Sequence, residues 1–275
     1  MRFLVAGADR VDAGKTTFSV GLVDRTGARA FKPRAGNDYW FDHDDVRSAT
    51  GEGRMYGKDA RRLATAAPGS VDPEDINPVH RLWGPFPGPE SGLVGPADRR
   101  FLLDRVDRSF VVNAGADLPA MARDRLPVSD AVAVSSVEEL NEVSARRHLT
   151  ALRAVGRRIV DRETAVVESY GDVARPLQGS LPEGADATDL YDAVGVVEPG
   201  RVRVYDGERF VRACEVARAS PVDGQLERRV EDAIKHLDPI ASRPLPPLGK
   251  DERTDPAAIA DAYAPAYDDL IEAAE

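Results

Sequence analysis

The pattern of apolar and polar residues is clearest at the start of the chain. Residues 3–6 form a short apolar run that ends at Gly7, and a polar loop follows. Residues 16–25 are amphipathic and stop before Gly27. A short apolar run bounded by glycine is typical of a buried strand, and a periodic segment that ends at glycine is typical of a helix. The pattern therefore predicts a strand over 2–8, a polar loop and a helix over 16–25.

The rest of the pattern predicts an α/β fold. A second strand over 28–32 should end at Lys32, because Pro33 cannot donate a hydrogen bond to a sheet. The further predictions are a loop at 36–56, a helix near 58–65, apolar segments at 101–103, 110–115 and 131–134, a helix at 137–159, a strand at 164–172, three strands within 192–216, a helix at 222–237, a proline-rich linker at 239–247 and a helix at 256–274.

These elements predict a mostly parallel central sheet with helices on both faces and a C-terminal antiparallel extension. The antiparallel part is expected from the turns Pro199-Gly200 and Asp206-Gly207, since Asp-Gly is a strong hairpin signal. We expect one domain over 1–238, with an insert around 36–130. The linker and C-terminal helix of 239–275 would follow it.

The loop after the first strand carries the strongest chemical signal. Gly14-Lys15-Thr16-Thr17 stands where the strand gives way to the helix, as in the phosphate-binding loop of a P-loop NTPase. In such a loop backbone N–H groups cradle the phosphates, the lysine reaches the β- and γ-phosphates, and the next hydroxyl binds Mg²⁺. The alternative is an ordinary turn before a capped helix. The residues expected to bind nucleotide are Asp12, Ala13, Gly14, Lys15, Thr16 and Thr17.

Two further candidates stand at the ends of predicted strands. Ligands of open α/β sheets bind at the carboxyl ends of the strands, so Lys32 is expected beside the phosphate loop. A phosphate loop also needs a carboxylate at a neighbouring strand end, to hold Mg²⁺ or its water. Glu168 is the best candidate. Asn113 is the rival, although an amide is the poorer partner for Mg²⁺.

The order of these short motifs resembles dethiobiotin synthetase. Here Gly7-x-Asp9…Gly14-Lys15-Thr16 is followed by Phe31-Lys32-Pro33, then Asp59-Ala60-x-x-Leu63, then Asn77-Pro78. The family has the loop G-T-D-T-x-x-G-K-T, a Lys-Pro strand end, a D-A-x-x-L helix and an Asn-Pro segment. The match covers about the first eighty residues and one later strand, where Glu168-x-x-Gly171 resembles the family's Glu-Gly-Ala-Gly.

The resemblance implies an ATP- and Mg²⁺-dependent enzyme that activates a carboxylate-type oxygen of a small acid by phosphoryl transfer. It implies Lys15 and Lys32 as catalytic residues, and Thr16, Asp59 and Glu168 as the metal-binding set. It also suggests a homodimer, since members of the family often build the site across two chains.

The sequence departs from the family pattern in three places. The loop is one residue longer, Arg10 replaces a threonine, and an aromatic, acidic insert follows the second strand. The family's substrate pocket is not recognisable, so the resemblance does not identify the substrate.

Two other classes of function stay open. One is a regulatory GTPase or ATPase switch, although the guanine-selective Asn-Lys-x-Asp loop is absent and the segment from Asn113 to Asp117 has the wrong spacing. The other is a nucleotide-binding sensor without catalysis. His80, His148 and His236 are expected to be structural. The acidic run 42–45 is expected to be a solvated loop face, with a hard-cation site as the less favoured alternative.

Composition narrows the partners and the compartment. The net charge of −10 argues against general nucleic-acid binding, and no apolar run approaches the roughly 20 residues of a membrane span. The single cysteine, Cys214, rules out an internal disulfide. Only five of the 37 basic residues are lysines, which is typical of a salt-adapted cytoplasm or a GC-rich genome. Because the chain enters a strand at once, we expect no signal peptide and a cytoplasmic protein.

Overall fold

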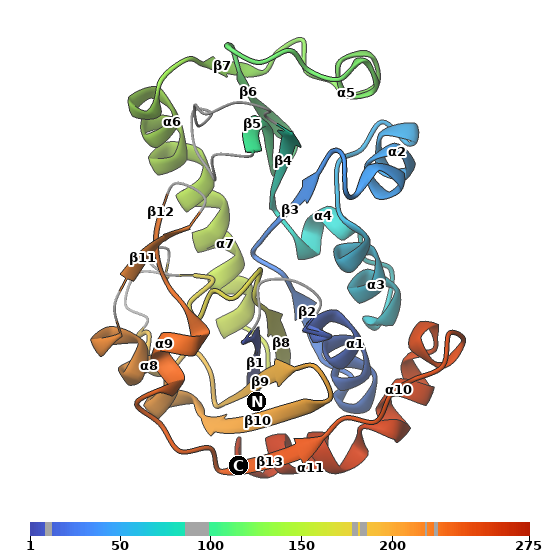
Figure 1. Ribbon diagram of the computed structural model, residues 1–275, viewed down its shortest axis with the longest axis vertical. Helices are drawn as coiled ribbons and strands as arrows, with labels where there is room; N and C mark the ends of the chain where they lie inside the picture. The colour runs from blue at the N-terminus through green and yellow to red at the C-terminus, as the bar shows by residue number, and fades with distance from the viewer. Residues whose placement is uncertain (9–12, 86–98, 178–180, 182–185, 218, 223–224) are drawn as a thin grey trace.

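The computed structural model describes the whole chain except residues 9–12, 86–98, 178–180, 182–185, 218 and 223–224 (Figure 1). The described residues form a six-stranded sheet, a five-stranded sheet and a two-stranded hairpin. No helix in this part of the chain combines the length and apolarity that crossing a membrane requires.

The first sheet has the strand order β13-β10-β9-β1-β8-β2. Its parallel part consists of β9 (Ala193–Glu198), β1 (Arg2–Gly7), β8 (Ala165–Glu168) and β2 (Arg29–Phe31). The edge strands β10 (Arg201–Asp206) and β13 (Ala241–Pro244) run antiparallel. The mostly parallel sheet with an antiparallel extension is therefore confirmed, as is the turn at Pro199-Gly200.

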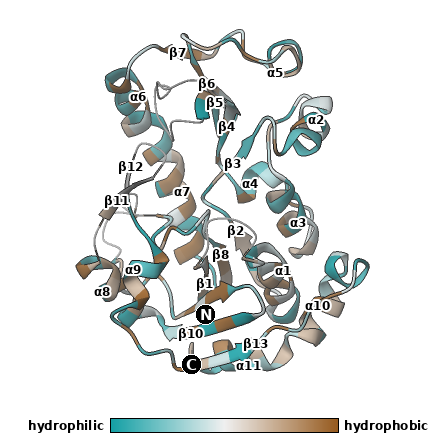
Figure 2. Cartoon of the chain, viewed as in Figure 1, coloured by the Kyte–Doolittle hydropathy of each residue, from teal (hydrophilic) through white to brown (hydrophobic). Residues whose placement is uncertain are grey.

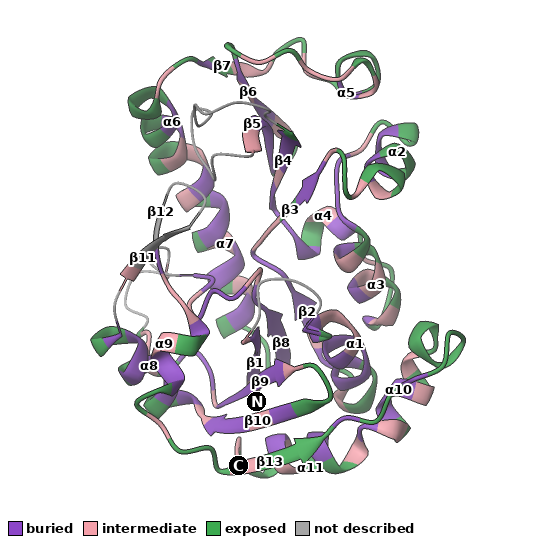
Figure 3. Ribbon diagram, viewed as in Figure 1, coloured by how far each residue is buried: buried purple, intermediate pink, exposed green. Residues whose placement is uncertain are grey.

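Helices cover both faces of this sheet, as predicted. Phe3 and Val5 of β1 face α1 (Lys15–Thr26), α3 (Lys58–Ala66), α10 (Pro256–Ala262) and α11 (Ala264–Glu272). Leu4 and Ala6 face α7 (Leu149–Val160), α8 (Gly207–Val216) and α9 (Val230–Ile234). Alternate residues of a strand point to opposite faces, so a continuous apolar run serves two cores. Figures 2 and 3 show these strands as hydrophobic and buried.

The second sheet is formed by strands from residues 34–134. It consists of β3 (Arg34–Asp38), β4 (Val79–Pro85), β5 (Arg99–Val106), β6 (Ser109–Asn113) and β7 (Val132–Val134), in that order. One face packs on α2 (His43–Gly51) and α5 (Ala120–Arg125), and the other on α6 (Val137–Val143). A short helix, α4 (Pro73–Ile76), leads into β4.

Two segments join the sheets. The extended chain leaves the first sheet after β2, passes Lys32-Pro33 and enters the second sheet as β3. The predicted helix over 137–159 is also present, as α6, a π-helical turn η1 (Ser144–His148) and α7. Its first part packs on the second sheet and its last part on the first (Figure 1). Lys32 therefore lies at the junction between the sheets.

The predicted loop over 36–56 is wrong. It contains the end of β3 and the whole of α2. Asp42 begins α2, and its carboxylate accepts a hydrogen bond of 2.8 Å from the backbone N–H of Asp38. Acidic residues in the first turn suit the positive end of a helix dipole, so the acidic run marks a helix start.

The third strand predicted within 192–216 and the helix predicted over 222–237 are also wrong. Asp206 caps α8, where its side chain accepts from the N–H of Arg209, and Asp206-Gly207 makes no hairpin turn. Phe210, Val211 and Cys214 then lie on one buried face of that helix.

Residues 222–237 contribute to the hairpin β11 (Ala219–Val222) and β12 (Gln225–Arg228), and among the described ones only α9 is helical. The 239–247 segment supplies β13, and the single helix predicted over 256–274 is two helices, α10 and α11.

The C-terminal helices pack closely against α1 at Gly21. A Cβ atom added there would lie 2.4 Å from the Tyr267 hydroxyl and 2.6 Å from a methyl group of Ile259. Gly21→Ala should therefore lower the free energy of unfolding by about 1–2 kcal/mol, since overpacking outweighs the helix propensity of alanine. Urea unfolding measures this loss. In the Gly21→Ala background, Tyr267→Phe should lower the free energy of unfolding by less than it does in the wild type, because it removes the crowding hydroxyl. If the effects of the two substitutions simply add, the close contact is contradicted.

Candidate functional site

Side chains from four segments converge at the carboxyl end of the parallel strands. The register aligns Val5 of β1 with Glu168 of β8, so these strands end at the same edge. Lys32 follows β2 at this edge, and α1 begins here with Lys15 and Thr16. Asp59 comes from the first turn of α3.

Glu168 is the centre of the contacts. Its Oε1 atom accepts hydrogen bonds from the Thr16 hydroxyl at 2.9 Å and from the Lys32 ammonium at 2.6 Å. Lys32 also donates to Asp59 at 2.6 Å. The Glu168 side chain is 0% exposed and that of Lys32 is 5% exposed. The geometry thus brings together all three residues of the predicted metal-binding set, together with Lys32.

The charges stabilise one another. Burial lowers the pKa of Lys32, but the carboxylates of Asp59 and Glu168 outweigh it and hold that pKa above its usual range. Burial raises the pKa of Asp59, but Lys32 outweighs that effect and brings the pKa to about 2. Both side chains are therefore charged over the whole neutral range.

Lys15 has a different environment. Its side chain is buried, burial lowers its pKa, and it makes no hydrogen bond or ion pair with the described residues. Glu168 Oε2 is likewise buried and has no hydrogen-bond partner among them. Buried polar groups in proteins are normally paired. An anion beside the Lys15 ammonium group and a hard cation beside Glu168 Oε2 would give each of these groups a partner. The two groups therefore fit a phosphate ligand together with Mg²⁺.

The start of α1 also suits an anion. Gly14 has φ 87°, a left-handed conformation that favours glycine, and α1 has no side-chain cap within the described residues. Uncapped N–H groups and the helix dipole attract phosphate. Ala13 and Gly14 are described, and Thr17 follows Thr16 in the first turn of α1. Asp12, also predicted to bind nucleotide, lies outside the described residues with the rest of 9–12.

The contribution of Asp59 to the stability of the fold should depend on pH. Its pKa in the folded protein, about 2, lies below the usual 3.8, so its contribution to stability is complete above pH 4 and is lost as the pH falls towards 2. The stability advantage of the wild type over Asp59→Asn should therefore shrink across this range. Urea unfolding at several pH values measures it, with the exposed Asp44→Asn as the matched control. An advantage that stays constant from pH 5 to pH 2 would contradict the ion pair.

The Asn-Pro segment holds the backbone of Lys32. The N–H of Lys32 donates to the carbonyl of Ile76 at 2.9 Å, and the Asn77 amide donates to the carbonyl of Lys32 at 2.9 Å. Asn77 is 0% exposed, and its amide also donates to the carbonyl of Val79. In this chain the segment therefore positions Lys32, a role that the sequence alone did not suggest.

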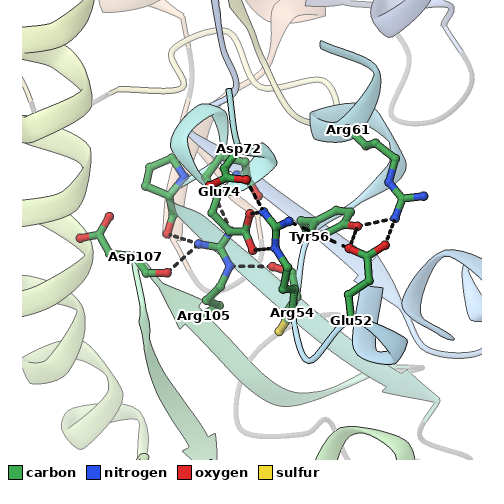
Figure 4. Close-up of polar contacts among 11 residues, drawn as sticks. Glu52, Arg54, Tyr56, Arg61, Asp72, Glu74, Arg105 and Asp107 are labelled. Carbon is green, nitrogen blue, oxygen red and sulfur yellow. Dashed lines mark hydrogen bonds and ion pairs between the residues drawn. The ribbon is translucent and has the colours of Figure 1, made fainter. Parts of the chain in front are cut away.

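A buried arginine supports Asn77 in turn (Figure 4). Arg105 of β5 donates to the backbone carbonyls of Met55, Asn77, Pro78 and Asp107. Beside it, Arg54 pairs with Glu74 and Asp72, so the two arginines tie the segments around α3 and α4 to the second sheet. Arg105 was not predicted as a functional residue. Its one sequence signal is its position two residues after the apolar segment 101–103.

The other candidates lie elsewhere. Asn113 is on β6 in the second sheet and donates to the carbonyl of Phe101, so the geometry favours Glu168. His80 is buried on β4, with its ring nitrogens 2.9 and 2.7 Å from the amide oxygens of Asn77 and Asn37, and burial lowers its pKa to about 3. Asp45 accepts from the N–H of Lys58 and from the amide of Asn37. The described part of the chain contains no group of three or more His, Cys, Asp or Glu placed to hold a metal.

Comparison of the chain with protein-family models, curated proteins and solved structures finds no match. The resemblance to dethiobiotin synthetase therefore rests on the short sequence motifs alone.

Proposed function

We propose that this protein is a Mg²⁺-dependent ATPase of the P-loop NTPase type that activates a small carboxylic acid by phosphoryl transfer. One observation carries the proposal. Lys15, Thr16, Lys32, Asp59 and Glu168 converge at one edge of a mostly parallel sheet, beside the start of α1. Among them Lys15 is a buried cation that makes no ion pair with the described residues.

The chemistry needs positioning and neutralisation of charge more than covalent help. Lys15 would bind the β- and γ-phosphates, and the N–H groups at the start of α1 would hold the same phosphates. Thr16, Asp59 and Glu168 would hold Mg²⁺ directly or through water, and the ion would neutralise part of the triphosphate charge. Lys32 would face the transferred phosphoryl group and the acceptor oxygen.

The transfer would form one bond and break one bond. A carboxylate oxygen of the acid bonds to the γ-phosphorus, and the bond from that phosphorus to the bridging oxygen breaks. The products are an acyl phosphate and ADP, and the step itself needs no proton. Lys32 stabilises charge on the equatorial oxygens as the bonds change.

A steady-state assay of phosphate release tests the proposal, with Mg·ATP or Mg·GTP and with or without a panel of small carboxylic acids. Turnover that rises with an acid supports the enzyme. Tight nucleotide binding without turnover would instead indicate a sensor, and slow turnover that follows a protein partner would indicate a switch. Calorimetry that detects no binding of either nucleotide would overturn the nucleotide site itself.

A further inference from the structure

A cavity of about 270 Å³ lies between the start of the second sheet and the helix that joins the two sheets. Arg34 and Arg81 line it from the strands, Tyr170 lines it from the segment after β8, and His148 lines it from the π-helical turn. Small-molecule sites are often cavities with an apolar lining and a few polar groups, and this one is slightly smaller than most of them. π-helical turns are frequent at functional sites.

This cavity adjoins the edge where the site residues converge. Arg34 is two residues beyond Lys32 in the chain, and Tyr170 is two residues beyond Glu168. Two residues of chain span at most about 7 Å. The cavity therefore lies close to the backbone of Lys32.

The cavity wall carries two fixed cations. Arg81 makes a two-pronged pair with Asp104, with both distances 2.7 Å, and Arg34 pairs with Glu227 at 2.7 Å. Neither carboxylate lines the cavity, whereas both guanidinium groups belong to residues that do. These pairs fix the orientation of both guanidinium groups, and a guanidinium group has five N–H donors.

His148 adds a buried acceptor. Its Nε2 lies 2.8 Å from Asp104, whose pKa stays well below its usual range because Arg81 outweighs the effect of burial. An ionised carboxylate accepts, so the Nε2 atom carries the hydrogen. In the neutral ring Nδ1 is then a bare acceptor, and this atom is buried without a partner among the described residues. His148 is 4% exposed.

We propose that this cavity binds the acceptor acid, and that the acid is a small hydroxy acid with an apolar chain. Its carboxylate would lie beside Arg34, two residues beyond Lys32 in the chain, and its hydroxyl would donate to Nδ1 of His148. The apolar chain would contact Trp83 and Leu152, which line the same cavity. The role as acceptor pocket rests on the proposed function, whereas the binding of the acid does not.

Trp83 supplies a direct reporter. The chain has two tryptophans, and the other, Trp40, is 71% exposed and does not line this cavity. In Trp40→Phe protein, fluorescence should change saturably on titration with 2-hydroxy-4-methylpentanoate. Binding of 4-methylpentanoate should be about three- to tenfold weaker, since it lacks one hydrogen bond. The alcohol 4-methyl-1-pentanol, which lacks the carboxylate, should bind more weakly still.

A blocking variant locates the site. Ala145 is exposed and lines the cavity, so Ala145→Phe should abolish the fluorescence change without entering a core. Thr150→Phe is the matched control, because Thr150 is exposed on the same helix and does not line the cavity. No saturable change, equal binding of the alcohol, or unchanged binding to Ala145→Phe would each overturn the proposal.

Phosphate release separates this inference from the proposed function. An acid that binds should raise ATP turnover in the wild type, and Lys15→Met should bind the same acid without turnover. If the acid binds while ATP turnover continues at an unchanged rate, the cavity is not the acceptor pocket. If the acid binds and neither nucleotide is turned over, the pocket stands as an acid-binding site and the proposed function fails.

Discussion

Lys15→Met should reduce ATP turnover by at least about a hundredfold and leave the thermal midpoint unchanged or higher. The first effect follows because one preorganised charge on a transferring phosphoryl group commonly contributes a hundredfold or more. The second follows because Lys15 is a buried cation without an ion pair among the described residues, and methionine fills a similar volume at no cost in desolvation. Phosphate release and thermal unfolding of the same preparation measure both effects.

The matched control for Lys15 is Lys235→Met. Lys235 is exposed on the outer surface beside α9, so this variant removes the same charge and should turn over ATP at the wild-type rate. A Lys15→Met protein that also works at the wild-type rate would remove the basis of the active-site assignment. A large drop in its thermal midpoint would show instead that Lys15 supports the fold.

Lys32→Met should lower the free energy of unfolding by about 3–5 kcal/mol, because it leaves a buried carboxylate without its cation. Glu168 is 0% exposed, and without Lys32 the Thr16 hydroxyl is its remaining donor among the described residues. Urea unfolding without a divalent ion gives the value. Adding Mg²⁺ should raise the stability of Lys32→Met more than that of the wild type, since the ion can replace the lost charge.

A second substitution checks the cause of that loss. In the Lys32→Met background, Glu168→Gln removes the uncompensated charge and should recover part of the lost stability, although it destabilises the wild type. If Lys32→Met and Glu168→Gln lower the free energy of unfolding by amounts that simply add in the double variant, the buried pair is contradicted. If Mg²⁺ stabilises Lys32→Met and the wild type equally, the ion binds elsewhere.

Local sequence patterns were sufficient to predict the part of the site that β1 and α1 form. The apolar run of β1, the glycine at position 14 and the periodic segment of α1 are each local, so the strand–loop–helix unit follows from them. Parallel strands that end at the same edge bring distant residues together. For this reason Lys32 and Glu168 could be predicted as strand-end neighbours before the fold was known.

The support around the site could not be predicted in this way. Asn77 and Arg105 act through backbone carbonyls of segments far away in the chain, and no local pattern marks a carbonyl as a partner. His148 was expected to be structural. The π-helical turn places its Nε2 beside Asp104, and only then is it evident that its Nδ1 has no partner among the described residues.

The sequence by itself determined the α/β class and the position of the Gly14-Lys15-Thr16 motif, because both follow from short-range patterns. The alternation of strands and helices along the chain predicted the mostly parallel sheet. The tertiary structure alone decided between alternatives that the local sequence allows. Asp206-Gly207 can make a hairpin turn or cap a helix, and burial of Phe210 against the first sheet selects the helix. Glu168 and Asn113 both end strands, but of these two strands β8 pairs with β1 and β6 pairs with β7, because pairing in a sheet depends on packing between segments far apart in the chain.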